Sequence, residues 1–147
     1  MIALFPGRFQ PLHRGHLHAI KSVLKKFDKV VIMIGSINKS DENNPYSFLK
    51  RKKMLNAALK KYKNRYRIIG IADIDDNKWT KAVNKAKFDV VVTGNSWVKK
   101  CLRGFKTIKP SLLKPKTYNA TRIRYLMKNG KKWQHLVPKE ILTIIEY

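Results

Sequence analysis

FPGRFQPLHRGH, residues 5–16, is the stretch that decides the fold. An apolar run, residues 1–5, leads into it, and a helical pattern of apolar residues follows it. A strand, a tight turn and a helix start are therefore expected in immediate succession. In an open α/β sheet, ligands bind outside the carboxyl ends of the strands, and a helix N-terminus there offers unpaired N–H groups that suit phosphate. Arg8, His13 and His16 come at this point, so we expect donation of hydrogen bonds and charge to a polyphosphate.

The three histidines of this stretch allow a second interpretation, a zinc site formed by His13, His16 and His18. Such a site needs convergent side chains, and on a helix His18 points away from His16. We therefore rank metal binding below phosphate binding and expect no metal ligands in the chain. Gly15, between the first two histidines, leaves room for backbone or ligand to come close.

The composition predicts one domain with polyanionic partners. The chain has 147 residues, enough for one domain spanning residues 1–147 with a sizeable core. It has 33 Lys and Arg against 9 Asp and Glu, a formal net charge of +24. Such a charge favours nucleotides, nucleic acid or acidic membrane surfaces without choosing among them. For most of these lysines, a solvated surface is the simpler interpretation.

Cysteine use and hydropathy indicate a cytoplasmic protein. The single Cys101 excludes an intramolecular disulfide framework and fits a reducing compartment. It follows a helical apolar pattern, so we expect a buried structural thiol. The apolar stretch at the N-terminus is too short for a signal peptide, and no window reaches the ~18 apolar residues of a membrane span, so we expect no membrane association.

Short β-rich runs alternate with longer amphipathic runs, which predicts an α/β fold with an open parallel sheet of about five strands and helices on both faces. The expected strands are residues 2–5, 29–34, 67–72, 88–93 and 105–108. The expected helices are residues 15–27, 47–62, 78–86, 96–102, 120–128 and 138–147, with an irregular segment at 110–117.

His13-x-Gly15-His16 resembles the HxGH signature of a nucleotidyltransferase superfamily that transfers AMP or CMP onto phosphate groups. The longer form, GRFQPLHRGH at residues 7–16, is similar to the archaeal-type nicotinamide-nucleotide adenylyltransferases. The resemblance implies a Rossmann-like fold and ATP binding by Arg8, Phe9, His13 and His16. A Walker A motif, a GxGxxG motif and paired cysteines are absent, which leaves P-loop and classical dinucleotide-binding interpretations weak.

Residues 118–124 (YNATRIR) resemble a second signature of the superfamily, the helix-opening segment ISSTxIR. Thr121 and Arg124 match it, whereas Asn119 stands where the family has its first Ser. Asn can still cap a helix, and its amide can donate a hydrogen bond to an anion. The resemblance implies that Asn119 and Thr121 bind ATP phosphates and that Arg124 bridges the phosphates that react. Taken alone, the segment is an ordinary capped helix start.

Three further segments resemble the archaeal enzymes and imply the remaining contacts. In the first, residues 35–55, Arg51 matches an arginine that contacts the mononucleotide phosphate, although by itself it is one more cation of a basic helix. In the second, residues 73–79, the resemblance implies mononucleotide contacts from Ile74, Asn77 and Trp79, with Trp79 stacking on nicotinamide; a Trp at a helix start equally covers apolar surface. The third is TGN at residues 93–95, whose members Gly94 and Asn95 fall on the adenine side or form an ordinary turn.

The implied activity is adenylyl transfer from ATP to nicotinamide mononucleotide, giving NAD and pyrophosphate, with Mg²⁺ arriving on ATP. A phosphomonoester already carries nearly two charges at neutral pH, so it needs no general base and no protein nucleophile. Other acceptors in the same superfamily are flavin mononucleotide, phosphopantetheine and sugar-alcohol phosphates. Nucleic-acid binding is the alternative from another class, but the sequence has no RNA-binding sheet signature or zinc finger. Relatives of this type are typically multimers, so a homo-oligomer is expected.

Overall fold

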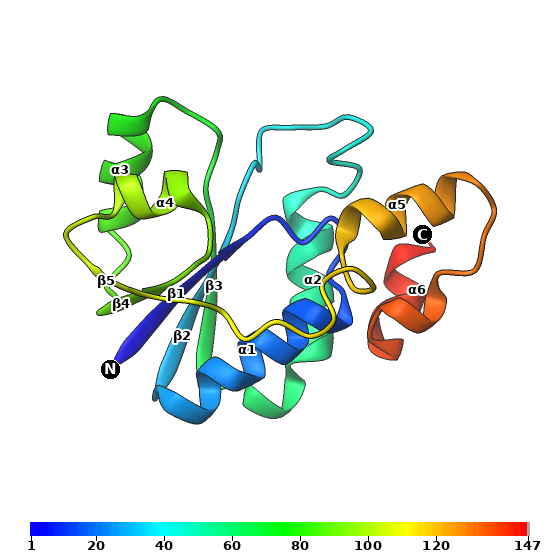
Figure 1. Cartoon of the computed structure of the whole chain (residues 1–147), viewed down its shortest axis with the longest axis horizontal. Coiled ribbons are helices and arrows are strands. Elements are labelled where there is room, and N and C mark those ends of the chain that lie inside the picture. Colours follow the sequence, from blue (N-terminus) through cyan, green and yellow to red (C-terminus); the bar gives the residue numbers. More distant parts are fainter. Residues whose placement is uncertain (147) are drawn as a thin grey trace.

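A twisted parallel sheet runs through the middle of the molecule, with helices against both of its faces (Figure 1). The structure is a computed structural model, and it describes residues 1–146. The strand order is β3-β2-β1-β4-β5, and every pairing is parallel. The strands are β1 (Ile2–Gly7), β2 (Lys29–Ile34), β3 (Tyr66–Gly70), β4 (Val90–Val92) and β5 (Lys106–Ile108). The sequence-based prediction of a five-stranded, Rossmann-like parallel sheet is confirmed.

The helices divide into two layers. The α-helices are α1 (Arg14–Lys26), α2 (Phe48–Ala58), α3 (Asp76–Asn84), α4 (Ser96–Cys101), α5 (Ala120–Lys128) and α6 (Leu142–Ile145). Three short 3-10 helices are η1 (Lys60–Tyr62), η2 (Gln134–Leu136) and η3 (Lys139–Ile141). Helices α1 and α2 cover one face, and α5 and α6 pack on the same side; α3 and α4 cover the other face (Figure 1).

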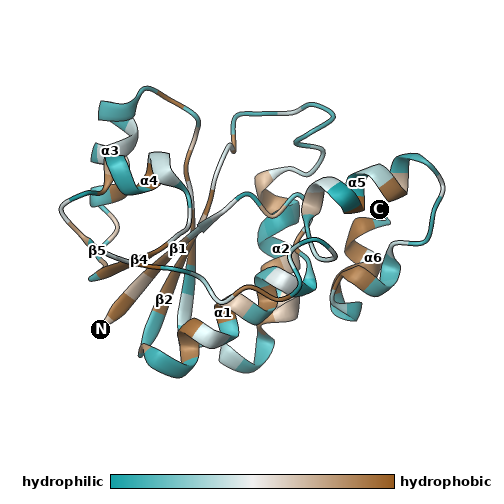
Figure 2. Cartoon of the chain, viewed as in Figure 1, coloured by the Kyte–Doolittle hydropathy of each residue, from teal (hydrophilic) through white to brown (hydrophobic). Residues whose placement is uncertain are grey.

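Two apolar clusters hold these layers together, one on each face of the sheet. Successive side chains of a strand point to opposite faces. In β1, Ala3 and Phe5 therefore join the cluster under α1 and α2, whereas Leu4 joins the cluster under α3 and α4. The same alternation places Ile32 in the first cluster and Val31 in the second. The central strands are consequently mainly apolar, apart from the exposed Lys29 that opens β2, and Figure 2 shows brown segments in β1 and β4.

The order of the strands creates a crevice at the carboxyl ends of the central strands. From the central β1 the chain moves outward through β2 and β3, and then returns to β4 on the other side of β1. The connections that leave β1 and β4 therefore diverge at their carboxyl ends, and ligands of open α/β sheets bind at such a point. The stretch at residues 8–13 and the turn at residues 93–95 both lie there.

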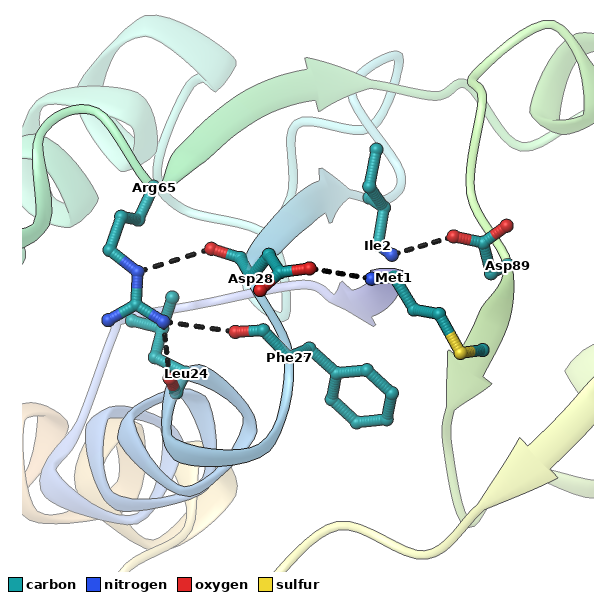
Figure 3. A network of polar contacts seen from close by, with 7 residues as sticks. All are labelled: Met1, Ile2, Leu24, Phe27, Asp28, Arg65 and Asp89. Carbon is teal, nitrogen blue, oxygen red and sulfur yellow. Dashed lines mark hydrogen bonds and ion pairs between the residues drawn. The ribbon is translucent and has the colours of Figure 1, made fainter.

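At the opposite end of the sheet, where the strands begin, polar contacts hold the N-terminus in place (Figure 3). The amino group of Met1 donates to Asp28 Oδ2 at 2.8 Å, and the Ile2 N–H donates to Asp89 Oδ2 at 2.7 Å. The Arg65 guanidinium donates to three carbonyl groups at the end of α1 and in the turn that follows it. These bonds fix the start of β1 between its neighbours and leave its carboxyl end for the site.

The boundaries of several elements differ from those predicted. β1 continues to Gly7 because Gly7 pairs with Ile34 of β2. Helix α3 begins two residues earlier than expected because the Asp75 side chain accepts a hydrogen bond from the Lys78 N–H and caps it. The helix expected over residues 47–62 ends at residue 58, and the last helix is reduced to η3 and α6. Residue 147 of that last prediction lies outside the described residues.

Candidate active site

His13 and His16 cap the helix that starts the site. The His16 N–H donates to His13 Nδ1 at 3.3 Å, and the His13 N–H donates to His16 Nδ1 at 3.1 Å. The two imidazole rings stack with their centroids 3.6 Å apart. Because Nδ1 of each ring accepts a hydrogen bond, the single proton of each neutral imidazole is on Nε2. Each ring thus keeps one N–H with which it can bind a ligand.

The two histidines are uncharged at neutral pH. Burial lowers the pKa of His13 from 6.5 to about 4. Burial, and then the proximity of His13, lower the pKa of His16 well below 6.5. We expected these side chains to supply charge as well as hydrogen bonds; the charge is absent because both rings are taken out of water, where an imidazolium is unfavourable.

The lowered pKa of His13 should make the fold sensitive to mild acid. In the unfolded chain, the imidazole of His13 becomes protonated as the pH falls through 6.5, whereas in the folded protein it is protonated only near pH 4. Stability therefore falls over this window. Between pH 7.5 and pH 5, we expect the free energy of unfolding in urea to drop by about 2 kcal/mol from this residue. His16, whose pKa is also lowered, adds to the loss in the same window. Carboxylates with lowered pKa values, such as Asp28 and Asp41, contribute only at lower pH, around and below their usual pKa of 3.8.

The control for this prediction is His13→Asn, because an Asn oxygen can still accept from the His16 N–H but cannot titrate. The drop between the two pH values should shrink by about 2 kcal/mol in the variant. An identical drop in the variant and the parent would refute the assignment to His13.

Gly15 is needed where it stands because the ring of His13 lies against it. A Cβ atom at this position would be 2.9 Å from His13 Cε1 and 3.2 Å from Tyr118 Cβ. The space that we expected beside Gly15 is therefore taken by the capping imidazole. Phe9 supports the same arrangement from beneath: it is 1% exposed, and its ring centroid lies 4.7 Å from that of His16.

Arg124 joins the late capped helix to the opening turn. Its Nη1 donates to the main-chain oxygen of Gln10 at 2.8 Å, and its Nη2 lies 3.4 Å from Thr121 Oγ1. Burial lowers the pKa of Arg124, and the positive charge of nearby Arg8 lowers it further. The opening turn and α5, over a hundred residues apart in the sequence, therefore bring Arg8 and Arg124 close together, as the two sequence signatures predicted.

Arg51 is a buried cation beneath this group, not one more charge on a basic surface. It is 0% exposed and donates to the main-chain oxygens of Arg8 at 2.8 Å, Gly35 at 2.7 Å and Ser47 at 3.3 Å. Its Nη2 is buried and has no hydrogen-bond partner among residues 1–146. Burial, followed by the charge of Arg8, lowers its pKa. The side chain ties the end of β2 to the opening turn and adds positive potential from below.

Two hollows flank these groups. The first, of about 360 Å³, lies at the crevice and is called the ring hollow; its polar and aromatic lining residues are Arg8, Ser36, Asp73, Trp79, Thr93, Asn95 and Trp97. The second, of about 600 Å³, lies between residues 42–46 and α5, and its lining includes Tyr46, Thr121, Arg124, Tyr125 and Lys128. His13 and His16 line neither, because they are packed together at the head of α1.

Asn95 and Asn119 both act as helix caps. The Asn95 side chain accepts from the Val98 N–H at the start of α4, beside an exposed Gly94. The Asn119 oxygen accepts from the Arg122 N–H, as predicted. Its amide nitrogen, however, donates to the main-chain oxygens of Pro115 and Lys116, at 3.0 and 3.3 Å. The amide hydrogen that we expected for an anion is thus used within the loop.

Ile74 and Asn77 do not reach the ring hollow. Ile74 is 42% exposed, and Asn77 lines a separate depression between α3 and α4. Trp79 does line the ring hollow, but it is only 4% exposed. Of the residues assigned to the mononucleotide, the structure therefore brings Arg8 and Trp79 to one hollow, with Arg51 buried near Arg8.

Gln10 is a residue of the site that sequence reasoning passed over. Its buried side-chain amide pairs with the main chain of Tyr46: it accepts from the Tyr46 N–H at 2.9 Å and donates to the Tyr46 oxygen at 3.1 Å. The main-chain oxygen of Gln10 also receives Arg124. Its place inside the GRFQP motif was the available signal. Trp97, which lines the ring hollow beside Trp79, had no comparable signal.

Within residues 1–146, no three His, Cys, Asp or Glu side chains gather where they could hold a metal ion. In the same range, no helix combines the length and the apolar character needed to cross a bilayer. Cys101 is half-buried and packs against the cluster under α3 and α4, rather than lying fully within it.

Comparison with known proteins assigns the chain and its fold to a family of nucleotidyltransferases. The chain belongs to the cytidylyltransferase-like family, whose sequence model matches residues 4–138. A curated relative, the nicotinamide-nucleotide adenylyltransferase of Methanococcus vannielii, is 39% identical over 99% of this chain and 88% of its own length. The protein of the same name from Pyrococcus furiosus is 39% identical over 97% of this chain and 81% of its own. The resemblance inferred from the HxGH and GRFQP residues is confirmed.

Solved structures agree with this assignment. A bifunctional NMN adenylyltransferase/ADP ribose pyrophosphatase from Francisella tularensis, complexed with AMP and a manganese ion, superimposes with a TM-score of 0.80 at 30% identity. The match covers 92% of this chain and 44% of that one, so the chain spans less than half of the bifunctional protein. A second crystal structure of the Francisella protein gives the same values.

Proposed function

We propose that this protein transfers the adenylyl group of ATP to nicotinamide mononucleotide, releasing NAD and pyrophosphate, as a step of NAD biosynthesis. One observation carries the proposal: the 2.8 Å hydrogen bond from Arg124 to the main-chain oxygen of Gln10. It brings the phosphate-binding signature of α5 against the HxGH turn, in a chain whose archaeal relatives bear the name of this activity.

The reaction is a single displacement at the α-phosphorus of ATP. A phosphate oxygen of the mononucleotide forms the new bond to this phosphorus, and the bond to the bridging oxygen of the β-phosphate breaks. The electron pair leaves with pyrophosphate. No proton has to be removed from the nucleophile, because a phosphomonoester is already ionised near neutral pH. The protein has only to position two anions and to stabilise the charge that develops between them.

The catalytic groups are His13, His16 and Arg124. The Nε2–H groups of the two neutral histidines donate hydrogen bonds to phosphate oxygens, and the capping bonds at Nδ1 hold the rings in place. Arg124 and Arg8 supply the positive charge. Neutral donors held in a fixed position need no reorganisation during the reaction, which is the condition under which such groups contribute most.

Binding is divided between the two halves of the crevice. The ATP group comprises Arg8, Phe9, His13, His16, Gly94, Asn95, Asn119, Thr121 and Arg124. The mononucleotide group comprises Arg8 and Trp79, with Arg51 beneath Arg8; Ile74 and Asn77, which the resemblance had also implied, lie outside the hollow that these residues share. Phe9 and Arg51 act from beneath, through the residues that they support, because both are buried.

Mg²⁺ enters with ATP and is bound mainly by phosphate and water, which is how this ion commonly reaches nucleotide enzymes. The described residues offer it no cluster of protein ligands of their own. The single Cys101, with no partner for a disulfide within the chain, fits work in the reducing cytoplasm.

The test is pyrophosphate release from ATP with one acceptor at a time: nicotinamide mononucleotide, flavin mononucleotide, phosphopantetheine or a sugar-alcohol phosphate. We expect release with nicotinamide mononucleotide and formation of NAD in equal amount. Release only with another acceptor would reject the substrate, and no release with any of them would reject the activity.

A Gly15→Ala variant should lose activity without losing stability. Its new Cβ would be 2.9 Å from His13 Cε1, so the ring must move. Displacing a positioned group by about 1 Å can cost on the order of 10²-fold in rate, and we expect a loss of about 10- to 10²-fold in kcat/KM. Alanine is the better helix former by about 1 kcal/mol, which offsets the clash in the thermal midpoint.

The matched control is Gly104→Ala, because a Cβ at Gly104 would meet nothing within 4 Å. This variant should keep the activity of the parent. Equal activity of the Gly15→Ala and Gly104→Ala proteins would show that the position of the His13 ring does not matter to catalysis.

A further inference from the structure

A depression of about 520 Å³ between α3 and α4 is lined by three cations that the candidate active site does not use. Lys81 comes from α3, Lys100 from the last turn of α4, and Arg103 from the turn that follows α4. The lining shares no residue with either hollow of the candidate active site. The two helices lie on the face of the sheet opposite α5 (Figure 1). This basic depression is therefore a separate place on the molecule.

The fold brings the three cations together from two helices. Asn77, Thr80 and Lys81 have the spacing i, i+3, i+4, so they share one face of α3. The indole Nε1–H of Trp97 donates to Asp76 Oδ1 at 3.0 Å, which joins the start of α4 to the start of α3. The helices are thus held side by side, and the cations at the end of α4 reach the same depression as Lys81.

These positive charges are not neutralised by the protein. The side chains of Lys81, Lys100 and Arg103 form no ion pair and no hydrogen bond with any residue in the described range 1–146. Among the described lining residues, Asp76 is the only carboxylate, and its Oδ1 already accepts the indole hydrogen of Trp97. The lining therefore carries three positive charges and one negative charge. Like charges gathered in one place repel each other, and a polyvalent anion bound among them removes this repulsion.

The volume and the donors of the basic depression fit a chain of linked phosphates. Its volume falls in the range of small-ligand sites and exceeds what a single phosphate ion fills. Lysine binds phosphate as a point charge and arginine as a planar fork, and the Thr80 hydroxyl and the Asn77 amide are further donors. The cations gather in a depression and do not follow a long groove, which favours a small anion over a nucleic-acid strand.

We propose that the basic depression is a second phosphate-binding site, and that its ligand is a linear oligophosphate. Inorganic tripolyphosphate and the triphosphate of a nucleotide share this chemistry. The proposal does not depend on adenylyl transfer, because none of the three cations belongs to the site of that reaction. It also gives a specific role to three of the 33 basic residues, which the proposed function leaves without one.

Cys101 supplies a local readout of the site. It is the only cysteine of the chain, is half-buried and lines the basic depression. Its alkylation by iodoacetamide, an uncharged reagent, is followed in the whole protein with tripolyphosphate, ATP or orthophosphate, at constant ionic strength and without divalent cations. Tripolyphosphate should slow alkylation at least about 5-fold, and it should act at concentrations about 10-fold below those of orthophosphate, because it engages several cations at once. Equal slowing by ATP extends the site to nucleotides, whereas slowing by tripolyphosphate alone restricts it to inorganic chains.

A variant that combines Lys81→Gln, Lys100→Gln and Arg103→Gln should need about 10-fold more tripolyphosphate for the same slowing, the effect expected from the loss of three exposed charge contacts. The rates with and without the anion are compared within each protein, so the direct effect of the removed charges on the thiol cancels. Pyrophosphate release should stay within about twofold of the parent, as for ordinary surface substitutions.

The matched control combines Lys21→Gln, Lys25→Gln and Lys60→Gln. It removes the same number of charges from exposed positions of α1 and η1, on the other side of the sheet. Its Cys101 should be protected by tripolyphosphate as in the parent. Calorimetry gives a second measurement that does not use the thiol: the variant of the basic depression should bind one tripolyphosphate fewer per chain than the control.

The proposal is overturned if both triple variants respond to tripolyphosphate alike, or if they bind the same number of tripolyphosphate ions. Protection by orthophosphate equal to that by tripolyphosphate would also overturn it, because the net charge alone would then attract anions to this surface. Absence of any protection by tripolyphosphate would reject the site outright. None of these results bears on the adenylyl transfer, which is measured separately by pyrophosphate release.

Discussion

His16→Ala should reduce kcat by on the order of 10²-fold or more, because the substitution removes a neutral, fixed hydrogen-bond donor at the point where charge develops. In the folded protein, the ring of His16 is held between Phe9 and His13, and its Nδ1 is occupied by the His13 N–H. The donor that remains, Nε2–H, is the one lost in the variant. Steady-state kinetics with saturating ATP and nicotinamide mononucleotide measures the effect.

The matched control is His18→Ala, two residues further along the same helix. His18 bonds Ser111 Oγ at 3.0 Å on the surface and lines neither hollow. Its loss should leave kcat within about twofold of the parent, as for an ordinary surface substitution. Thermal unfolding of both variants shows whether the fold survives. A folded His16→Ala protein with the turnover of the parent would contradict the assignment.

Arg124→Ala should cost about 10²- to 10³-fold in kcat/KM, the loss expected when a donor to a developing charge is removed from a preorganised site. The side chain also connects α5 to the opening turn through the main-chain oxygen of Gln10, and it contacts Thr121 within α5, so positioning is lost together with charge. Arg124→Lys should recover only part of the loss, since an ammonium group lacks the planar fork that makes both contacts.

Arg122→Ala serves as the comparison, because Arg122 is on the same helix, is exposed, and donates to the main-chain oxygen of Thr117 instead of to the opening turn. Its activity should stay close to that of the parent, with at most a small rise in the KM for ATP. If the two arginine variants lose activity equally, Arg124 contributes to catalysis only through its positive charge, and its position beside the opening turn does not matter.

The order of strand, loop and helix at the site could be predicted because it depends on residues that are neighbours in the sequence. FPGRFQPLHRGH contains an apolar run, a turn with Gly and Pro, and a helix start, and β1, the loop and α1 follow in that order. Helix α5 occupies residues 120–128 as predicted, with Asn119 as its cap, since capping is a contact between residues close in sequence. The parallel sheet followed from the alternation of short apolar runs and amphipathic segments.

The protonation state of the histidines could not be predicted in this way. It depends on how far Phe9 and the surrounding core remove the rings from water, which is a property of the folded packing. The burial of Arg51 is similar: its partners are three main-chain oxygens presented by different segments, and nothing in a run of basic residues distinguishes it from its exposed neighbours. The two hollows likewise depend on tertiary packing, since the larger one lies between residues 42–46 and α5, which are far apart in the sequence.

The contact between Trp79 and Trp97 was also beyond the sequence, for the same reason. Trp79 and Trp97 belong to different helices, and their contact exists only because α3 and α4 pack side by side on one face of the sheet. A resemblance to known enzymes pointed to Trp79, which is almost completely covered, whereas the accessible ring belongs to its neighbour.

The stereochemical course at the α-phosphorus tests the account most directly. An ATP analogue with sulfur replacing one non-bridging α-oxygen, in a single configuration, is reacted with nicotinamide mononucleotide, and the configuration of the resulting dinucleotide is determined. Direct attack by the mononucleotide phosphate, aided by His13, His16 and Arg124 without a covalent intermediate, predicts inversion. Retention would require two successive displacements through an adenylylated side chain, and would contradict the account.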